Sequence, residues 1–477
     1  MKKELLNFVK KFSQEIKQNN AAIFAGAGLS LPAGYVNWVE LLKPLAEELE
    51  IDIYRENDLV TLAQYYKNEK DNRYELNQRI IEEFSDDKEG TENHRILARL
   101  PIETYWTTNY DSLIEDTLKS NGKIVDVKYE VEHLATTKPK RDVVLYKMHG
   151  DKSNPSKAIL LKEDYEIYST NYEPFITALK GDLVAKTFLF MGFSFTDPNL
   201  DYILSRVRIS YGQNTRPHYA FIKKVNRDEY KDKADFEYYS RKQELFLKDL
   251  KRYKIEALLI DDYSEITEVL KLIEKTINLN NIFISGSAYI YEPFEETNAK
   301  LFIEELSKKL INLNNKIVSG FGLGIGSYVI NGALEEIYMN QKRINDNQLI
   351  LRPFPQSRAK NENLRDTWKR YREDMISQTG IAIFIFGNKL EDSEIVEASG
   401  VYSEFEIAKK NNNIIVPVGI TGSMAKIIWD EVNKNFESFY PNATSKLRLL
   451  FKKLNSTTEY NHLIDDIIDF INEAKNR

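Results

Sequence analysis

The segment Ala21-Ala22-Ile23-Phe24-Ala25-Gly26-Ala27-Gly28-Leu29-Ser30 passes from an apolar run directly into a glycine turn. We expect a buried strand over residues 21–24 and a helix near residues 38–49. A strand, a glycine turn and a helix in this order place backbone N–H groups where a phosphate can dock. Leu31 stands where the G-x-G-x-x-G motif of hydride-transferring enzymes has its third glycine, which disfavours that class. By itself, the turn is equally compatible with tight packing and no ligand.

Apolar runs of strand length alternate with helical stretches along the whole chain, a pattern typical of α/β domains with mostly parallel sheets. The first half contains six such runs, at residues 21–24, 104–107, 143–147, 187–191, 218–222 and 257–260. The second half contains five more, at residues 282–285, 316–319, 349–351, 381–386 and 414–418. We therefore expect two Rossmann-like domains, residues 1–278 and 279–477, with the boundary just after a helix over residues 266–277.

The composition limits the chemistry that this chain can perform. Among its 477 residues, 42% are hydrophobic, 29% are charged and none is cysteine. Such a chain folds around ordinary cores. Without cysteine it has no disulfide, no thiolate nucleophile and no cysteine-ligated zinc or iron–sulfur cluster. We therefore expect a cytoplasmic protein that needs no metal.

Charge and hydropathy exclude several kinds of partner. The net charge is −7, with acidic and basic residues interspersed, so we expect no nucleic-acid surface. The first residues contain no sustained apolar segment of the kind that a signal peptide has. The longest apolar stretches, such as residues 381–386, are far shorter than the roughly 20 residues of a membrane-spanning helix. We therefore expect no contact with a membrane.

Two polar segments follow later predicted strands. They are Thr107-Thr108-Asn109-Tyr110-Asp111 and Met148-His149-Gly150-Asp151. With the glycine turn they outline one site that binds a dinucleotide and then attacks it. Asn109 can donate and accept hydrogen bonds at once, and a histidine suits the role of a base near neutral pH. A lone histidine at a strand end is more often a core residue, but the His-Gly turn after a buried strand favours catalysis by His149.

The three segments together resemble the NAD-binding domain of the sirtuin family, over roughly residues 10–275. In that family a Gly-Ala-Gly-x-Ser turn cradles the pyrophosphate, a Thr-Gln-Asn-x-Asp segment lies beside the nicotinamide ribose, and a His-Gly pair supplies the catalytic histidine. A fourth segment, residues 192–199, corresponds to a later loop near the adenosine. The resemblance implies Asn109 and His149 as catalytic residues. It implies these residues for NAD⁺ binding: Gly26, Ala27, Gly28, Ser30, Asp111, Gly192, Ser194 and Asp197.

Two departures from the sirtuin pattern change the expected reaction. Deacylases of that family carry a zinc module with two cysteine pairs, which this chain cannot build, and their Gly-x-Pro-Asp-Phe-Arg stretch is replaced by residues 32–38. With no acyl-lysine to accept the ribosyl carbon, water becomes the acceptor. We expect hydrolysis of NAD⁺ to ADP-ribose and nicotinamide, with NAD⁺ as substrate and no cofactor required.

The second half repeats the design of a strand followed by glycines. Residues 282–287 end in Gly-Ser, and glycines then stand at every second position from Gly320 to Gly326, as where backbone passes close to a ligand or a strand. The pattern resembles the SLOG family of nucleotide-binding domains. Residues 399–406 lack the glycine cluster of the nucleotide-cutting members, which favours a sensor. The candidate activator-binding residues are Gly286, Ser287, Gly322, Leu323, Gly324, Arg372, Lys389 and Glu404.

A sirtuin-like domain followed by a SLOG domain resembles the effectors of the Thoeris antiphage defence system. This resemblance implies a homotetrameric NAD⁺ hydrolase that stays inactive until a partner enzyme with a TIR domain makes a cyclic ADP-ribose isomer. The SLOG domain binds that signal, and depletion of NAD⁺ then stops the infected cell. Three alternatives stay open: a deacylase or ADP-ribosyltransferase, a non-catalytic nucleotide-binding module, and a second domain that itself cuts nucleotides.

Overall fold

The computed structural model describes residues 2–56, 58–212, 214–339, 348–354 and 364–475. The chain divides into two compact units, Met1–Glu274 and Lys275–Arg477. The division lies inside helix α13 (Ser264–Asn278), which includes the helix expected over residues 266–277. The expected boundary after residue 278 stays a prediction. Each unit is described separately below.

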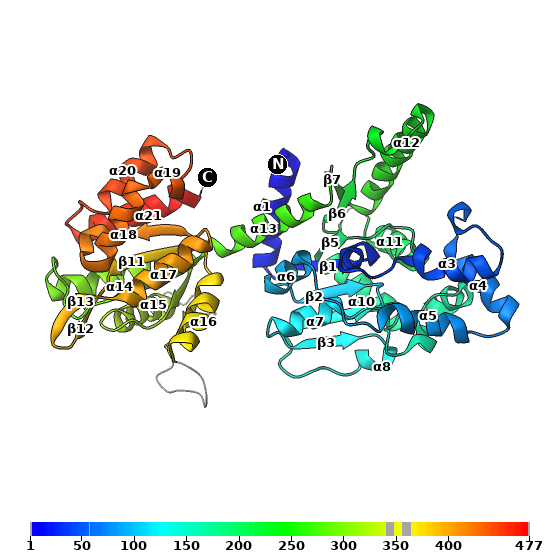
Figure 1. The fold of residues 1–477 in the computed structure, drawn as a ribbon, viewed down its shortest axis with the longest axis horizontal. Coiled ribbons are helices and arrows are strands. Elements are labelled where there is room, and N and C mark those ends of the chain that lie inside the picture. Colours follow the sequence, from blue (N-terminus) through cyan, green and yellow to red (C-terminus); the bar gives the residue numbers. More distant parts are fainter. Residues whose placement is uncertain (1, 57, 213, 340–347, 355–363, 476–477) are drawn as a thin grey trace. The chain divides into compact units, whose positions relative to one another are not determined.

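The first unit contains a parallel sheet in the order β3-β4-β2-β1-β5-β6-β7 (Figure 1). Its strands are β1 (Ala21–Ala25), β2 (Thr104–Thr107), β3 (Val125–Lys128), β4 (Val143–Lys147), β5 (Thr187–Met191), β6 (His218–Lys223) and β7 (Ile255–Ile260). The six expected strands are present. The sequence analysis missed β3, a four-residue edge strand whose alternating pattern, VDVK, pairs Val125 with Val143 of β4.

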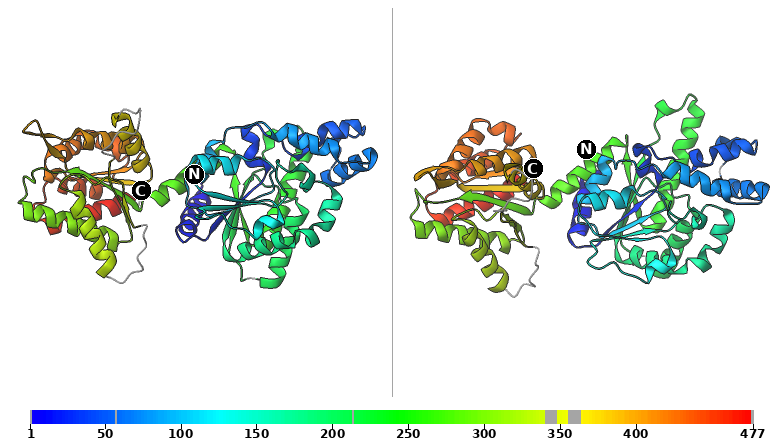
Figure 2. Two further views of the ribbon diagram at one scale, coloured as in Figure 1. Left: turned by 90° about the horizontal axis from the view of Figure 1, so that it is seen from below. Right: turned by 60° about the horizontal axis from the view of Figure 1, so that its bottom comes forward.

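Helices cover both faces of this sheet (Figure 2). They are α1 (Lys3–Lys17), α2 (Ala27–Ser30), α3 (Trp38–Glu48), α4 (Leu59–Lys70), α5 (Tyr74–Phe84), α6 (Glu92–Arg99), α7 (Leu113–Ser120), α8 (Val131–Leu134), α9 (Lys162–Asn171), α10 (Glu173–Ala185), α11 (Pro198–Tyr211), α12 (Lys233–Leu250) and α13. Single 3₁₀ turns lie at Leu31–Ala33, Ile53–Arg55, Pro155–Lys157, Arg227–Glu229 and Lys251–Tyr253. Because helices cover both faces, all five residues of β1 are buried, as expected for a central parallel strand.

The second unit contains a smaller parallel sheet in the order β10-β9-β8-β11-β14. Its strands are β8 (Asn281–Ser287), β9 (Lys316–Ser319), β10 (Leu349–Leu351), β11 (Ile381–Phe386) and β14 (Ile414–Pro417). All five match expected strands. An antiparallel hairpin of β12 (Asn388–Glu391) and β13 (Glu394–Glu397) was not expected, because its polar sequence has no apolar periodicity. The α/β class with two mostly parallel sheets is confirmed.

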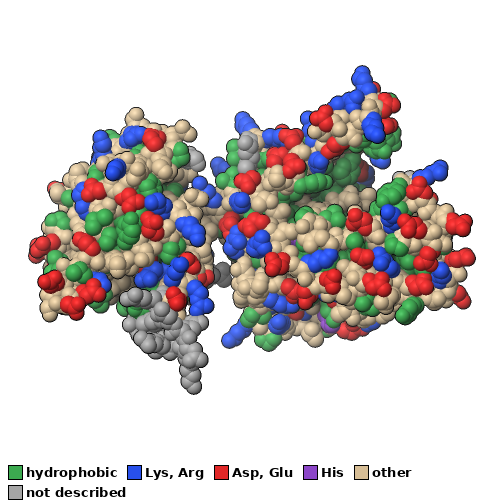
Figure 3. Space-filling model, in the orientation of Figure 1, with side chains coloured by type: hydrophobic (Ala, Val, Ile, Leu, Met, Phe, Trp, Pro, Cys, Tyr) green, Lys and Arg blue, Asp and Glu red, His purple; other side chains and the backbone are tan. Residues whose placement is uncertain are grey.

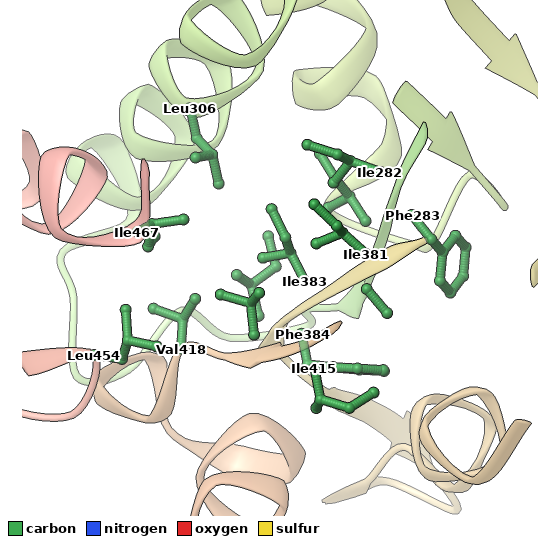
Figure 4. Packing of buried hydrophobic residues seen from close by; sticks show 14 of the residues in the cluster. Ile282, Phe283, Leu306, Ile381, Ile383, Phe384, Ile415, Val418, Leu454 and Ile467 are labelled. Atoms are coloured by element: carbon green, nitrogen blue, oxygen red, sulfur yellow. The ribbon is translucent and has the colours of Figure 1, made fainter. Parts of the chain in front are cut away.

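The core of the second unit lies between this sheet and its helices. The helices are α14 (Glu296–Asn312), α15 (Gly326–Met339), α16 (Leu364–Ser377), α17 (Ser399–Lys410), α18 (Ser423–Lys434), α19 (Phe436–Phe439), α20 (Ser445–Lys453) and α21 (Tyr460–Lys475), with a 3₁₀ turn at Gly419–Thr421. In Figure 4, Ile282 of β8 and Ile383 of β11 lie in one cluster with Leu306 of α14 and Ile467 of α21. Each such side chain contributes roughly 1.5–3 kcal/mol when fully buried.

The strand order determines where each unit can hold a ligand. In the first sheet β1 lies between β2 and β5, so the chain continues to one side of β1 and later returns to the other. In the second sheet β8 lies between β9 and β11 in the same way. Ligands of open parallel sheets bind at such points, beyond the carboxyl ends of the strands. The glycine turn of the first unit follows the central strand β1, while in the second unit Gly286 lies at the end of the central strand β8 and the glycine run from Gly320 follows β9.

Acidic and basic side chains are interspersed over the face shown in Figure 3. Within the described ranges, every helix is too short or too polar to cross a membrane.

Candidate active site

A cavity of about 1350 Å³ opens at the carboxyl edge of the first sheet. This volume exceeds the roughly 300–1,000 Å³ usual for small-ligand pockets, so an extended ligand fits. The cavity is lined by every residue predicted for catalysis or for NAD⁺ binding, namely Gly26, Ala27, Gly28, Ser30, Asn109, Asp111, His149, Gly192, Ser194 and Asp197. The structure therefore brings together four segments that lie far apart in the sequence.

The glycine turn after β1 is packed against the loop after β5. Gly26 N donates to Met191 O at 2.9 Å, and Gly28 N donates to Gly192 O at 2.9 Å. A Cβ on Gly28 would lie 2.8 Å from the Cα of Gly192, and Gly192 itself has a φ of +62°. Both glycines are therefore required by the close approach of two backbones, whatever ligand binds. Packing, which the sequence left as an alternative, is part of the reason for this motif.

Asn109 is fastened to the same turn. Its side-chain Nδ2 donates to Gly26 O and to Ser30 Oγ, both at 3.1 Å. Its backbone N donates to Thr107 Oγ1 at 3.0 Å. Because both hydrogens of the amide nitrogen have acceptors, the carbonyl oxygen of this side chain is the atom available to a ligand.

A buried lysine beneath the site holds two of its segments together. Lys147, the last residue of β4, is 0% exposed, and its Nζ donates to the carbonyl oxygens of Tyr110 at 3.1 Å and Asp111 at 2.6 Å. It also forms ion pairs with Glu115 at 3.1 Å and with Asp151. The sequence analysis missed this residue, although a lysine that ends an apolar strand two positions before His149 was a usable signal.

The charged groups in this cluster shift one another's pKa. Burial acts to lower the pKa of Lys147, but the carboxylates of Glu115 and Asp151 outweigh it and the pKa is raised. Burial raises the pKa of Glu115, and Lys147 only partly offsets this. Burial would raise the pKa of Asp151 too, but Lys147 lowers it below its usual value. The ammonium is therefore charged at any physiological pH.

His149 follows this lysine and is itself 1% exposed. Its Nε2 lies 3.3 Å from Asp197 Oδ2. Burial lowers the pKa of His149, and Asp197 and Asp164 only partly oppose the effect. The imidazole is therefore neutral at physiological pH, which is the state that a general base needs.

Two other buried histidines, His94 and His218, hold backbone groups in place. His94 Nδ1 accepts from Thr91 N at 3.2 Å, and His218 Nδ1 accepts from Phe188 N at 3.1 Å. Burial lowers the pKa of each to about 4. Neither His94 nor His218 lines the cavity around His149.

The glycines of the second unit also hold two backbones close together. Ala288 N, just after β8, donates to Leu323 O at 2.8 Å. A Cβ on Gly322 would clash with Gly286 O, and one on Gly324 would clash with Ala288 O. The side chain of Leu323 is 72% exposed at this edge. As in the first unit, packing accounts for the glycines.

Two of the polar candidates for activator binding, Arg372 and Glu404, meet each other and Ser285 of β8. Glu404, buried on α17, accepts from Ser285 Oγ at 2.6 Å and from Arg372 Nε at 3.3 Å. Burial raises the pKa of Glu404 although Ser285 and Arg372 both lower it. The Arg372 guanidinium also lies 4.8 Å from the ring centroid of Phe354. The arginine thus has a carboxylate partner already.

The remaining polar candidates, Ser287 and Lys389, lie at the end of β8 and on the hairpin strand β12. Ser287 Oγ donates to Asn388 O at 2.9 Å. Lys389 pairs with Glu391 at 2.8 Å on the same strand. Asn388, which the sequence analysis missed, accepts from Tyr289 N and donates to Ser423 Oγ, at 2.8 and 3.0 Å.

Comparisons with known proteins match a different family to each of two regions of the chain. Residues 103–258 match a family described as "SIR2-like domain", and residues 265–474 match the "Sir2- and TIR-associating SLOG family". The chain is 55% identical to "NAD(+) hydrolase ThsA" of Bacillus cereus (strain MSX-D12), over 98% of each chain. It is 48% identical to a protein of the same name from Acinetobacter baumannii (strain 532279), over 94% of this chain and 95% of that one. The chain belongs to the ThsA family of NAD(+) hydrolases.

Within this ThsA-family chain, the matched regions follow the two units. The SIR2-like match begins one residue before β2 and includes Asn109, His149 and Asp197, while the glycine turn after β1 lies outside it. The SLOG match begins inside α13 and includes all eight residues predicted for the activator.

The described residues offer no obvious place for a metal ion. No group of three or more His, Asp or Glu side chains among them has the arrangement of a metal site. The expectation that the protein needs no zinc stays a prediction.

Proposed function

We propose that this chain hydrolyses NAD⁺ to ADP-ribose and nicotinamide. The observation that carries the proposal is that Asn109, His149, the glycine turn after β1 and the loop after β5 line one cavity of about 1350 Å³. The names of its full-length relatives, "NAD(+) hydrolase ThsA", support the same reaction.

The reaction breaks the bond between C1′ of the ribose and the pyridinium nitrogen. The electron pair of that bond leaves with nicotinamide, which becomes neutral, while positive charge develops on the ribose. Water then forms the new bond to C1′ and gives up one proton. An enzyme helps by orienting the ribose and by accepting that proton.

The residues at the cavity can divide these tasks. His149, buried and with a lowered pKa, accepts the proton from water or from a ribose hydroxyl. The carbonyl oxygen of Asn109 accepts a hydrogen bond from the ribose or the water. The backbone around Gly26–Ser30 and Gly192–Ser194, which lines the cavity, binds the phosphates, and Asp111, which also lines it, orients its neighbours or contacts the nicotinamide amide.

The second unit regulates this activity in the same proposal. A cyclic ADP-ribose isomer, made by a TIR-domain partner when phage infects the cell, binds at Arg372 and Glu404, at Lys389, and at the turns 286–287 and 322–324. The match to a SLOG family that associates with Sir2 and TIR domains supports this role. Tighter binding to the active arrangement than to the resting one is what shifts the protein to activity. The proposal includes a cytoplasmic homotetramer and depletion of NAD⁺ as antiphage defence.

The experiment is release of nicotinamide from NAD⁺ by the purified protein, with and without each cyclic ADP-ribose isomer. We expect one isomer to increase the release, and His149→Ala and Asn109→Ala to abolish it. His462→Ala is the matched control, because that side chain is 73% exposed. Arg372→Ala should lose the response to the isomer. Absence of release under every condition would refute the hydrolase and favour a transferase or a binding module.

A further inference from the structure

The polar neighbour of His149 comes from the loop after β5. Asp197 is the N-cap residue of α11, and its Oδ1 accepts from Leu200 N at 2.8 Å. Its other oxygen, Oδ2, accepts from Tyr165 Oη at 3.1 Å and lies 3.3 Å from His149 Nε2. The helix end and the tyrosine therefore hold the carboxylate from two sides.

The contact between His149 and Asp197 is important because the imidazole is buried. His149 is 1% exposed, and neither ring nitrogen has a protein hydrogen-bond partner among the described residues. A buried polar group left without a partner costs roughly 1–3 kcal/mol. The 3.3 Å separation from Asp197 is within reach of a hydrogen bond after a small rotation of the ring, and catalytic hydrogen bonds often tighten only when substrate binds.

We propose that Asp197 is the positioning residue of His149, and that Tyr165 holds Asp197 in place for this task. The carboxylate accepts a hydrogen bond from Nε2–H, which fixes one tautomer and leaves the Nδ1 lone pair as the base. This inference rests on the proposed hydrolysis of NAD⁺. It differs from the family resemblance, which placed Asp197 near the adenosine and gave Tyr165 no role.

The other charged and titratable groups around the ring do not replace Asp197. Asp164 is engaged by Arg73, whose Nη1 donates to both carboxylate oxygens at 3.0 and 3.1 Å. Tyr168, whose ring centroid lies 6.4 Å from that of His149, donates its hydroxyl to Met148 O at 2.8 Å. Burial and Asp197 together keep the pKa of Tyr165 well above its usual value, so its hydroxyl remains a donor.

Two isosteric variants test the assignment. Asp197→Asn keeps an oxygen for the cap of α11 but removes the charge, and Tyr165→Phe removes only the hydroxyl. We expect Asp197→Asn to lower kcat for nicotinamide release about 10²–10⁴-fold with KM within about threefold, by analogy with other carboxylates that orient a catalytic histidine. Tyr165→Phe should lower kcat about tenfold, because the carboxylate stays but loses one of its two holds.

The pH profile separates positioning from a structural role. Asp197 raises the pKa of His149, so its removal should move the acid limb of kcat to lower pH. The matched controls are Asp201→Asn on the exposed face of α11 and Tyr172→Phe, whose hydroxyl meets only Lys157 O at 3.4 Å. Both should keep the wild-type kcat and pH profile.

A second measurement does not depend on activity. In protein labelled only at histidine, the NMR titration of His149, assigned by its loss in His149→Gln, should have a lower midpoint in Asp197→Asn. An unchanged midpoint, or a rise in KM at unchanged kcat, would overturn the proposal and return Asp197 to substrate binding. Absence of nicotinamide release by the wild type would refute the hydrolase, while the titration would still decide whether Asp197 positions His149.

Discussion

Replacing Lys147 with methionine removes the one ammonium that joins the two catalytic segments. In the wild type its Nζ meets the carbonyl oxygens of Tyr110 and Asp111 and the carboxylates of Glu115 and Asp151. Methionine fills a similar volume but satisfies none of these four oxygen-bearing groups. The variant therefore isolates the electrostatic contribution of the lysine from its packing.

The expected loss of stability is large because the ion pairs of Lys147 are buried. Lys147 is 0% exposed, and removal of one partner from a buried ion pair costs about 3–5 kcal/mol. This is a substantial part of the roughly 5–15 kcal/mol by which a folded domain is stable. At about 2–4 °C per kcal/mol, the melting transition of the first unit should fall by roughly 6–20 °C.

The loss of stability in Lys147→Met should increase with pH. Burial already raises the pKa of Glu115 above its usual 4.5, and the loss of Lys147 removes the main influence that lowers it, so the pKa rises further. An acid whose folded pKa is raised loses stability as the pH rises through that pKa. The deficit of Lys147→Met should therefore be largest at neutral pH and should shrink as the pH falls toward 4.5.

Scanning calorimetry of the full chain measures this prediction, since the two units can melt in separate transitions. Lys119→Met is the control, because Lys119 forms an exposed pair with Asp116 on α7, and such pairs contribute about 1 kcal/mol or less. Adding Glu115→Gln to Lys147→Met should restore part of the stability. If Lys147→Met melts within 2 °C of the wild type at pH 7, the buried cluster does not stabilise this site as argued.

Three further predictions follow from the same geometry. Gly192→Ala should prevent folding of the first unit, because its Cβ would clash with Leu29 N, whereas Gly181→Ala on α10 has open space and should be neutral or stabilising in thermal melts. The acid limb of nicotinamide release should have a midpoint below pH 6.5, because burial lowers the pKa of His149 and the neutral form is active; a midpoint above 6.5 would contradict this. Asn388→Ala should lower the free energy of unfolding of the second unit by about 1–3 kcal/mol for each buried hydrogen-bond partner that it leaves unpaired, which thermal melts measure. Isothermal titration of the same variant should show weaker binding of the cyclic ADP-ribose isomer.

Much of the fold could be predicted because buried parallel strands leave a strong signal. Runs such as Ile381–Phe386 are apolar throughout and lie between helical stretches, so their type and position were evident. The strand β3 and the hairpin of β12 and β13 could not be found in this way, because each of these strands has only four residues and charged or polar residues interrupt its apolar ones.

The site was predictable to a different degree. Motifs identified Asn109 and His149, and the structure places both at one cavity. Tyr165 acts through Asp197, which lies on another element, so no local pattern marks it. Lys147 could have been noticed as the lysine that ends the apolar strand β4 two positions before His149. The glycines alone could not distinguish a ligand site from tight packing, because the same residue type serves both. Only the structure separates these two reasons at Gly28 and Gly192.

The contact between Gly28 and Gly192 also limits how this protein can change. With no side chain on either side, the turn after β1 and the loop after β5 have no slack, and a single substitution at either position meets backbone. A tolerated variation at one turn therefore requires a matching displacement of the other. Ser194, two residues further along this loop, is exposed, but an insertion there would displace Asp197, the neighbour of His149. New specificity in this protein is thus easier to obtain at the far walls of the cavity than at its centre.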